Sequence, residues 1–465
     1  MNKAPPAKGC YDVAIIGAGV VGCAMARRFT LDGARVVLLE KGRDVLDGAS
    51  KANSAILHTG FDAPSGSLEQ ACIAAGYAEY LEIRQSLGLP LLKSGALVLA
   101  WDADQLARLG GLVEKAHNSG VGDVAMLTRD QILQREPQLS SKVMGGFEVP
   151  GEYLIDPWAS AHAYVLQAMA NGAELLRDCE VLTGQFDGDI WRLGTSRGDM
   201  EVRQIINCAG LYGDVVDQRL RGTSGFTIKP RKGQFVVFDK PASQLVRSVI
   251  LPVPSATTKG VVVFRTIFGN LAVGPTAEEQ DSRSDASTDR HVLEGLRDKG
   301  IAMLPSLAKY EVTTVYAGLR PATEFQDYQV FQDAERRYIT VGGIRSTGLS
   351  AALGIARHVA RLNAGAGFSG GAICDPVCPP PDRLSDYHPR DWQSPDHGGI
   401  LCHCELVTRR EIEAVLNGPM PPATLQGLKR RTRVCMGRCQ GFYCTGALAA
   451  LTRGRIDPPI GVSDG

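Results

Sequence analysis

A glycine-rich turn near the N-terminus constrains the fold more than any other feature of the chain. The segment 17–22 (GAGVVG) follows a short β-type run, 13–16, and opens a helix-like segment, 20–31. Glycines at Gly17, Gly19 and Gly22 permit a tight turn, close approach of a pyrophosphate group and tight packing of helix on strand. A second β-type run ends at Glu40, whose carboxylate can accept hydrogen bonds from ribose hydroxyls. Together these features predict a βαβ unit with the phosphates at a helix N-terminus.

Bulk properties set limits on the remaining function classes. A chain of 465 residues, 44% of them hydrophobic, is long enough for about three domains. Its 50 Lys and Arg residues balance 50 Asp and Glu residues, so no basic field favours nucleic acid. Apolar stretches are much shorter than the roughly 20 residues of a membrane span, and the first ten residues lack a signal core. We expect a cytoplasmic protein, with peripheral docking to the inner membrane and homo- or hetero-oligomerisation both left open.

The chain alternates between two kinds of segment before it reaches a break. The expected fold class is α/β (α+β): a Rossmann-like cofactor domain interleaved with a mixed-sheet substrate domain, plus a small helical, cysteine-rich domain. We assign 11–85, 151–225 and 336–365 to the cofactor domain, and 86–150 and 226–335 to the substrate domain. The stretch 366–398 is rich in Gly, Pro and Asp without a hydrophobic period, which predicts a linker. The cysteine-rich domain then covers 399–453.

Three further segments decide which dinucleotide is bound. They are 53–60 (NSAILHTG), 207–210 (NCAG) and 343–350 (GIRSTGLS), and an NAD site has no need of the last one. With them, residues 11–365 resemble the D-amino-acid-oxidase superfamily of flavoproteins, especially the FAD-dependent glycerol-3-phosphate and L-2-hydroxyglutarate dehydrogenases. The resemblance implies FAD, with a helix N-terminus at the flavin edge that becomes negative on reduction. It implies contacts from Gly17, Gly19, Gly22, Glu40, Asn53, Ser54, Ala209, Gly210, Gly343, Gly348, Leu349 and Ser350.

The same resemblance suggests two catalytic residues. Arg320, in the segment 317–321 (AGLRP), matches the arginine that holds the substrate's anionic group, a task suited to guanidinium. A solvated surface arginine is the plainer alternative. His58 matches the residue beside the flavin ring, where an imidazole can accept the hydroxyl proton. It can equally serve only to pack against the ring.

One departure bears on the substrate. Glycerol-3-phosphate enzymes carry a second arginine shortly after the first, before Asp-Tyr, whereas this chain has Gln326 before Asp327 and Tyr328. Loss of a phosphate-binding cation favours a carboxylate or a neutral polyol over a dianionic phosphate ester.

The cysteine-rich segment resembles the bacterioferritin-associated ferredoxin-like domain. Its CHC at 402–404 and MGRCQGFYC at 436–444 imply a [2Fe-2S] cluster on Cys402, Cys404, Cys439 and Cys444, with each short loop supplying the two ligands at one end. Tetrahedral zinc is the rival, because four thiolates serve it equally well. Cys435 is either a spare thiol or a competitor of Cys439. The basic run 429–433 (KRRTR) either offsets the cluster's charge or is a solvated helix end.

These observations predict an FAD-dependent dehydrogenase of a small anionic hydroxy compound, either a 2-hydroxy acid such as 2-hydroxyglutarate or glycerol 3-phosphate. Hydride would pass to flavin N5, and single electrons would leave through the cluster to a quinone or redox protein. Two alternatives stay open. One is an amine or D-amino-acid dehydrogenase, and the other is an electron-transfer subunit without a substrate of its own.

Overall fold

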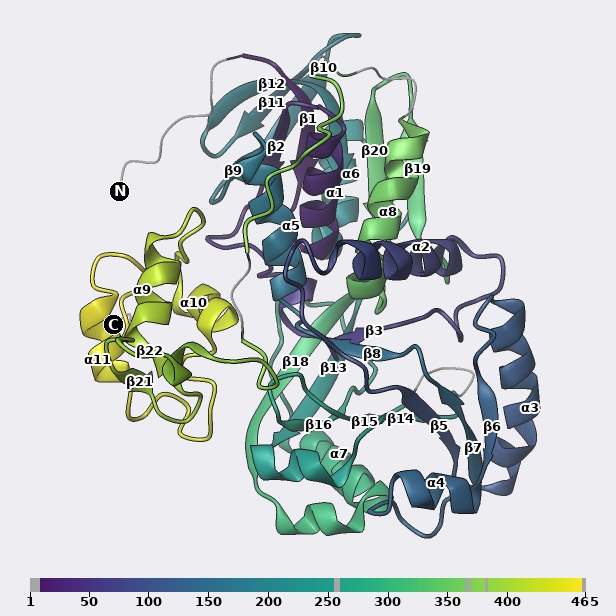
Figure 1. Ribbon diagram of the computed structural model, residues 1–465. Coiled ribbons are helices and arrows are strands. Elements are labelled where there is room, and N and C mark those ends of the chain that lie inside the picture. Colours follow the sequence, from purple (N-terminus) through teal and green to yellow (C-terminus); the bar gives the residue numbers. More distant parts are fainter. Residues whose placement is uncertain (1–8, 255–259, 364–367, 369, 381–383, 462–465) are drawn as a thin grey trace.

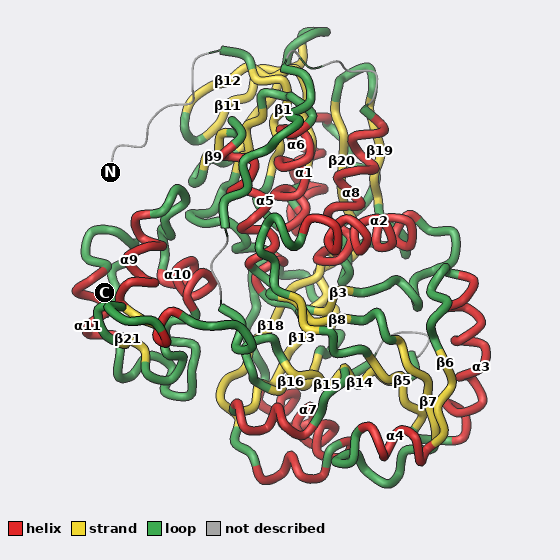
Figure 2. The backbone as a smooth tube through the Cα atoms, viewed as in Figure 1, coloured by secondary structure: helices red, strands yellow, loops and turns green. Residues whose placement is uncertain are grey.

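The computed structural model describes residues 9–254, 260–363, 368, 370–380 and 384–461. Two large β-sheets with flanking helices make up most of the molecule, and the C-terminal residues form a small lobe beside them (Figure 1). Figure 2 shows the strands of the two sheets in the upper and lower halves of the view, with a long helix, α2 (Leu68–Ile83), between them. Parts of the expected cofactor domain (364–365) and linker (366–367, 369 and 381–383) lie outside the described residues.

The upper sheet is built on the predicted βαβ unit. Strand β1 (Tyr11–Ile16) pairs in parallel with β2 (Val36–Leu39) and β12 (Gly198–Asn207). Parallel pairing continues from β2 to β9 (Glu174–Leu176) and from β12 to β20 (Tyr338–Gly342). Antiparallel strands complete the eight: β10 (Val181–Phe186), β11 (Trp191–Thr195) and β19 (Gln329–Asp333). The carboxyl ends of the parallel strands therefore meet at one edge, where such sheets bind ligands.

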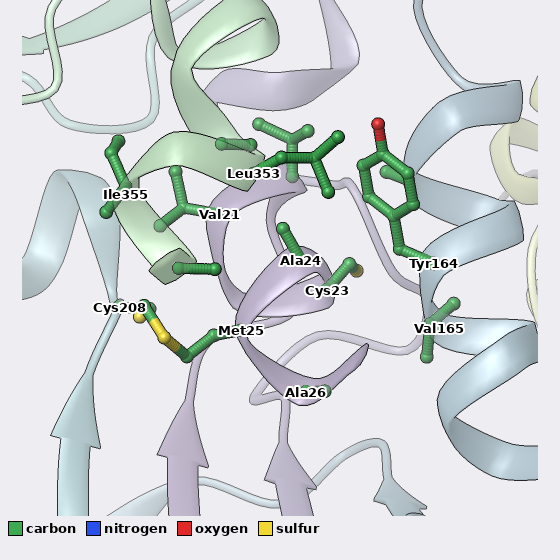
Figure 3. Packing of buried hydrophobic residues seen from close by; sticks show 14 of the residues in the cluster. Val21, Cys23, Ala24, Met25, Ala26, Tyr164, Val165, Cys208, Leu353 and Ile355 are labelled. Atoms are coloured by element: carbon green, nitrogen blue, oxygen red, sulfur yellow. The ribbon is translucent and has the colours of Figure 1, made fainter. Parts of the chain in front are cut away.

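Helix α1 (Val20–Leu31) carries few polar side chains, and most of its residues are buried by the elements around it. It packs on β1 and β2, and against α5 (Ala159–Ala170) and α8 (Gly348–Leu362). Figure 3 shows Ala24 of α1 between Tyr164 of α5 and Leu353 of α8. A helix that is apolar all round is a buried helix. This packing fixes the N-terminus of α1 relative to the sheet edge.

The lower, nine-stranded sheet joins two distant parts of the sequence. Its strands from the first part are β5 (Ala96–Ala100), β6 (Ala125–Thr128) and β7 (Gly145–Val149). The second part supplies β13 (Lys229–Phe238), β14 (Val249–Pro252), β15 (Val262–Arg265), β16 (Leu271–Gly274), β17 (Glu278–Glu279) and β18 (Val312–Ala322). The two parts join where β14 runs parallel to β5. Helices α3 (Ala103–Asn118), α4 (Arg129–Arg135) and α7 (Arg290–Met303) flank it (Figure 1).

A small three-stranded sheet links the two layers. In it β8 (Tyr153–Ile155) pairs antiparallel with β3 (Ile56–Leu57) and β4 (Leu91–Leu92). Helix α6 (Gly213–Arg221) covers the upper sheet near β10 and β20. The C-terminal lobe contains β21 (Ile400–Cys402), β22 (Val407–Thr408), α9 (Arg409–Asn417), α10 (Leu425–Thr432) and α11 (Thr445–Leu451). We call residues 399–461 the cysteine module.

Two features differ from the sequence-based expectation. Strand β19 was placed in the substrate domain, yet it pairs with β20 in the upper sheet. The expected linker is also not a free connection, because Leu384, Ser385 and Arg390 are buried against the rest of the protein. In the described part of the chain, no helix has both the length and the apolar character needed to cross a membrane.

Candidate functional site

A cavity of about 1160 Å³ lies between the two large sheets, at the carboxyl edge of the upper one. Most of the predicted site residues line it: Gly17, Gly19, Glu40, Asn53, Ser54, His58, Ala209, Gly210, Arg320, Gly348 and Leu349. Gly22, Gly343 and Ser350 are not among the lining residues. The cavity thus brings together segments as far apart in the sequence as Gly17 and Leu349.

The glycine-rich turn is shaped by contacts that exclude side chains. Gly17 has φ +102°, and a Cβ atom there would lie 2.6 Å from the carbonyl oxygen of Cys208. A Cβ atom on Gly22 would lie 1.8 Å from the Gly17 oxygen, so Gly22 serves the helix-strand packing rather than the cavity wall. Glu40 accepts hydrogen bonds from the backbone of Ala18 (2.8 Å) and Gly42 (2.7 Å), and burial raises the pKa of its carboxyl group. The carboxylate is therefore fixed beside the turn, as a ribose-binding group requires.

Opposite this turn, helix α8 begins at the cavity. Gly348 and Leu349, its first residues, line the cavity, which places free backbone N–H groups there. Ser350 lies behind them: its Oγ accepts a hydrogen bond from the backbone of His58 (2.8 Å) and donates one to the oxygen of Ile56 (3.2 Å). Gly343 has φ +67° in the turn that leads to the helix. Both residues thus shape the site from behind its surface.

His58 has a partner that the sequence analysis missed. Its Nδ1 lies 2.8 Å from an oxygen of Glu152, a side chain that is fully buried. Glu152 also accepts hydrogen bonds from the backbone (2.6 Å) and hydroxyl group (2.8 Å) of Thr59. The pair forms because β3 and β8 align Leu57 with Tyr153, so the residues just beyond them adjoin. No local motif marks Glu152, which lies 94 residues from His58.

Arg320 is half-buried at the cavity wall and has no acidic partner among the described residues. In this part of the chain, its guanidinium donates to two backbone oxygens, those of Lys232 (3.5 Å) and Thr276 (3.2 Å). Desolvation, aided by the positive charge of Arg231, lowers the pKa of Arg320 to about 10. A partly desolvated cation without a counter-ion is stabilised when an anion binds to it.

Arg231 stands directly opposite Arg320 in the antiparallel pair of β13 and β18. Opposite residues share one face of a sheet, and both arginines line the cavity. Arg231 is partly exposed and pairs with Glu279 at 2.9 Å. Two like charges facing each other are unfavourable on their own, so this arrangement suits an anionic ligand. The sequence alone does not reveal this pair, because the register of Arg231 with Arg320 depends on the fold.

Comparisons with known proteins identify this architecture. A family model described as "FAD dependent oxidoreductase" matches residues 12–362. The chain belongs to this family. FAD is accordingly its cofactor, and the cavity residues fit that group: the turn excludes side chains where a pyrophosphate must approach, and Glu40 stands at its end.

Individual members resemble the chain to different extents. A glycerol 3-phosphate dehydrogenase from Caloramator mitchellensis is 33% identical over 94% of this chain and 92% of its own length. A glycerol 3-phosphate oxidase from Mycoplasma pneumoniae is 29% identical over 76% of this chain and 94% of its own. The solved structure of L-alpha-glycerophosphate oxidase from the same organism, with FAD bound, has a TM-score of 0.74 at 27% identity, covering 79% and 97%. The chain is thus an FAD-dependent oxidoreductase, similar to enzymes named for CH–OH substrates.

The cysteine module of this flavoprotein brings five thiols together. Cys435 and Cys444 lie 3.4 Å apart, Sγ to Sγ, and Cys402 also contacts Cys444. Cys404 contacts Cys439. Two of these contacts run between the two cysteine segments, and the contact of Cys435 with Cys444 lies within the second segment. Within the described residues, no group of three or more His, Cys, Asp or Glu side chains is arranged to hold a single metal ion.

The basic run 429–433 is not a solvated helix end, because Arg430, Arg431 and Arg433 are buried. Arg431 forms a bidentate ion pair with Asp44 of the cofactor domain (2.7 and 3.0 Å), and both side chains are buried. Arg430 donates to the Val45 oxygen and pairs with Asp47 at 3.3 Å. These contacts attach the module to the loop that follows Glu40. The carboxylates were not noticed in the sequence because they lie almost 400 residues before their partners.

Proposed function

We propose that this flavoprotein is a dehydrogenase of glycerol 3-phosphate that passes electrons out through a [2Fe-2S] cluster in the cysteine module. The observation that carries the substrate assignment is the Arg320–Arg231 pair in the cavity that also contains His58. A phosphate dianion is the small anion best matched to two facing guanidinium groups. The names of the Caloramator and Mycoplasma relatives support the same substrate.

In this proposal, different residues bind the substrate, accept its proton and hold the cofactor. The two arginines bind the phosphate group and so orient the substrate in the cavity. His58 accepts the hydroxyl proton at Nε2, the ring nitrogen that is not bound to Glu152. The glycine-rich turn, Glu40 and the start of α8 hold FAD, which when bound supplies the two-electron acceptor for the C–H bond.

A 2-hydroxy acid is the second candidate. Gln326 lines the cavity where related enzymes carry a cation, which favours a singly charged carboxylate. An L-2-hydroxyglutarate dehydrogenase from Indibacter alkaliphilus is 28% identical over 57% of this chain. Arg231 supplies a cation from the neighbouring strand, and for that reason we place the phosphate ester first.

The arrangement of the thiols favours iron-sulfur over zinc. A [2Fe-2S] cluster takes two thiolates at each iron, and the contacts of Cys402 with Cys444 and Cys404 with Cys439 offer two such pairs. Structural zinc needs four donors around one point, and the described residues offer no such group. The chemistry of this donor set fits the cluster, which when bound accepts one electron at a time.

The extent of the relatives supports a dehydrogenase rather than an oxidase. The Caloramator match must include part of the cysteine module, because the module is larger than the part of the chain left unmatched. The match to the Mycoplasma oxidase is only about as long as the flavin part, 11–365. The longer match is thus to the relative named a dehydrogenase, which supports a role for the module in electron exit.

Steady-state assays on the purified holoenzyme test the proposal. With an artificial dye as acceptor, we expect a kcat/KM for glycerol 3-phosphate at least about 10-fold above that for L-2-hydroxyglutarate. This ratio corresponds to a difference in transition-state stabilisation of about 1.4 kcal/mol. We expect turnover with oxygen to be much slower than with the dye. A clear preference for L-2-hydroxyglutarate would overturn the substrate assignment, and equal rates with oxygen would overturn the assignment as a dehydrogenase.

A further inference from the structure

We infer that Glu152 is the positioning residue of the reaction and that it fixes His58 in the tautomer with a free Nε2. This inference rests on the proposed function. It goes beyond it by assigning a role to a residue that belongs to no recognised motif of the chain.

The hydrogen bonds to Glu152 determine where the proton on His58 resides. One carboxylate oxygen, Oε1, accepts from the backbone N–H and the hydroxyl group of Thr59. The other, Oε2, lies 2.8 Å from Nδ1 of His58. A carboxylate can only accept hydrogen bonds, so Nδ1 has to carry the proton. In the neutral ring, Nε2 then holds the lone pair, which is the form a proton acceptor needs.

The burial of Glu152 restricts the orientation of the His58 ring. The Glu152 side chain is fully buried, whereas 18% of the His58 side chain is exposed. A buried carboxylate that lost one of its donors would pay a desolvation cost, so the ring is held against rotation. The backbone of His58 is fixed as well, by Ser350 at the start of α8. The ring therefore stands between a rigid carboxylate and the cavity.

Glu152 and His58 have the geometry of a general base and a carboxylate that orients it. A base that must take a proton gains from a second group that selects its tautomer and stabilises the positive charge that develops on it. Glu152 itself does not line the cavity, although it contacts His58, which does. Its effect on the reaction has to pass through His58.

A double-mutant cycle tests this role in the holoenzyme. Because a general base contributes roughly 100-fold to 10,000-fold, we expect Glu152→Gln to lower kcat with glycerol 3-phosphate on the order of 100-fold. KM should change little, and Glu152→Asp should restore part of the rate. In a His58→Asn background, Glu152→Gln should cost less than about 2-fold more, because coupled residues are not additive. Full additivity of the two substitutions would overturn the inference.

Glu136 provides a matched control. It is also buried, and its carboxylate accepts hydrogen bonds from the backbone of Arg247 and Ser248, away from the cavity. Glu136→Gln should lose stability in a similar way without the selective loss of kcat. If both variants lose kcat equally, Glu152 has only a structural role.

A spectroscopic measurement separates this inference from the substrate assignment. In protein with ¹⁵N-labelled histidine, the eight histidines give ring-nitrogen signals, and His58→Asn identifies those of His58. Without substrate, we expect the Nδ1-protonated tautomer in the wild type and its loss in Glu152→Gln. The Nε2-protonated tautomer in the wild type would contradict the inference. Failure of glycerol 3-phosphate to react would instead refute only the proposed function, because this spectrum needs no substrate.

Discussion

The cavity and the cysteine module are built on different physical principles. The cavity is shaped by the backbone and by buried polar groups that are already paired, such as Glu40 on the Gly42 backbone and Glu152 on His58. The module has a small apolar core, of which Val407, Ile412 and Leu428 are fully buried members, and its thiols contact one another. A core of that size would gain much of its stability from the proposed cluster.

This difference shows which contacts hold the residues of each site in place. The walls of the cavity are held by the large core of the cofactor domain. The module has a smaller core, and ion pairs of Arg430 and Arg431 attach it to the cofactor domain. We therefore expect substitutions in the module to change electron exit and attachment while substrate oxidation at the cavity continues.

The largest effect is expected from the removal of one cluster ligand. Cys439→Ser should release most of the bound iron and lower turnover with a one-electron protein acceptor by at least about 1000-fold, because two thiolates are needed at each iron. Anaerobic bleaching of the flavin by substrate should be unchanged. Iron analysis and stopped-flow absorbance measure the two effects.

Cys435→Ser is the matched control for this experiment. Cys435 lies 3.4 Å from Cys444 but is not needed for either thiol pair. We expect it to retain iron and activity. If Cys435→Ser loses the iron and Cys439→Ser keeps it, the ligand assignment has to be exchanged between the two residues.

The second-largest effect is expected when the ion pair between the module and the cofactor domain is broken. Asp44→Ala leaves the buried Arg431 without its partner, and breaking a buried pair costs about 3 to 5 kcal/mol. We expect a correspondingly lower unfolding midpoint in denaturant and faster proteolysis between the layers and the module. Asp32→Ala, which breaks a more exposed pair with Arg28, should cost less than about 1 kcal/mol. Equal losses would show that the buried pair does not hold the module.

A pH-dependent effect is expected from Asp156, which lies at the start of α5. Burial raises the pKa of its carboxyl group to about 6, above the unfolded value, although Arg433 of the module opposes the shift. The folded state therefore holds the proton more tightly, so this contribution is present below about pH 4 and is lost as pH rises through 6. Asp156→Asn should remove a pH dependence on the order of 2 to 3 kcal/mol between pH 4 and pH 8. Urea titrations at both pH values measure it, and an unchanged pH slope contradicts it.

The smallest of these effects concerns the second arginine. Arg231→Gln should raise KM for glycerol 3-phosphate roughly 10-fold, since one charge-assisted hydrogen bond contributes about 1.5 to 3 kcal/mol. L-2-Hydroxyglutarate should be less affected, so the ratio of the two kcat/KM values should fall. Arg290→Gln, at an exposed ion pair on α7, is the control and should change neither value. An unchanged ratio in Arg231→Gln would remove Arg231 from the anion site.

The sequence predicted those parts of the molecule that depend on local patterns. The glycine-rich turn, Glu40 and the segments with His58 and Arg320 could be found because each lies in a short motif that converges on one sheet edge. Glu152, Arg231 and the Asp44–Arg431 pair could not, because each depends on a register or a contact between distant segments. The resemblance of the cysteine-rich segment implied which thiols gather, but the contacts of Cys402 with Cys444 and of Cys404 with Cys439 depend on the folded chain.

An anaerobic titration of the purified holoenzyme with glycerol 3-phosphate, followed by absorbance and low-temperature electron paramagnetic resonance, tests the central claim most directly. The account predicts that the flavin bands bleach and that the signal of a reduced [2Fe-2S] cluster grows in the same titration. Bleaching of the flavin without any cluster signal, in protein shown to contain iron, would contradict an electron exit through the cysteine module.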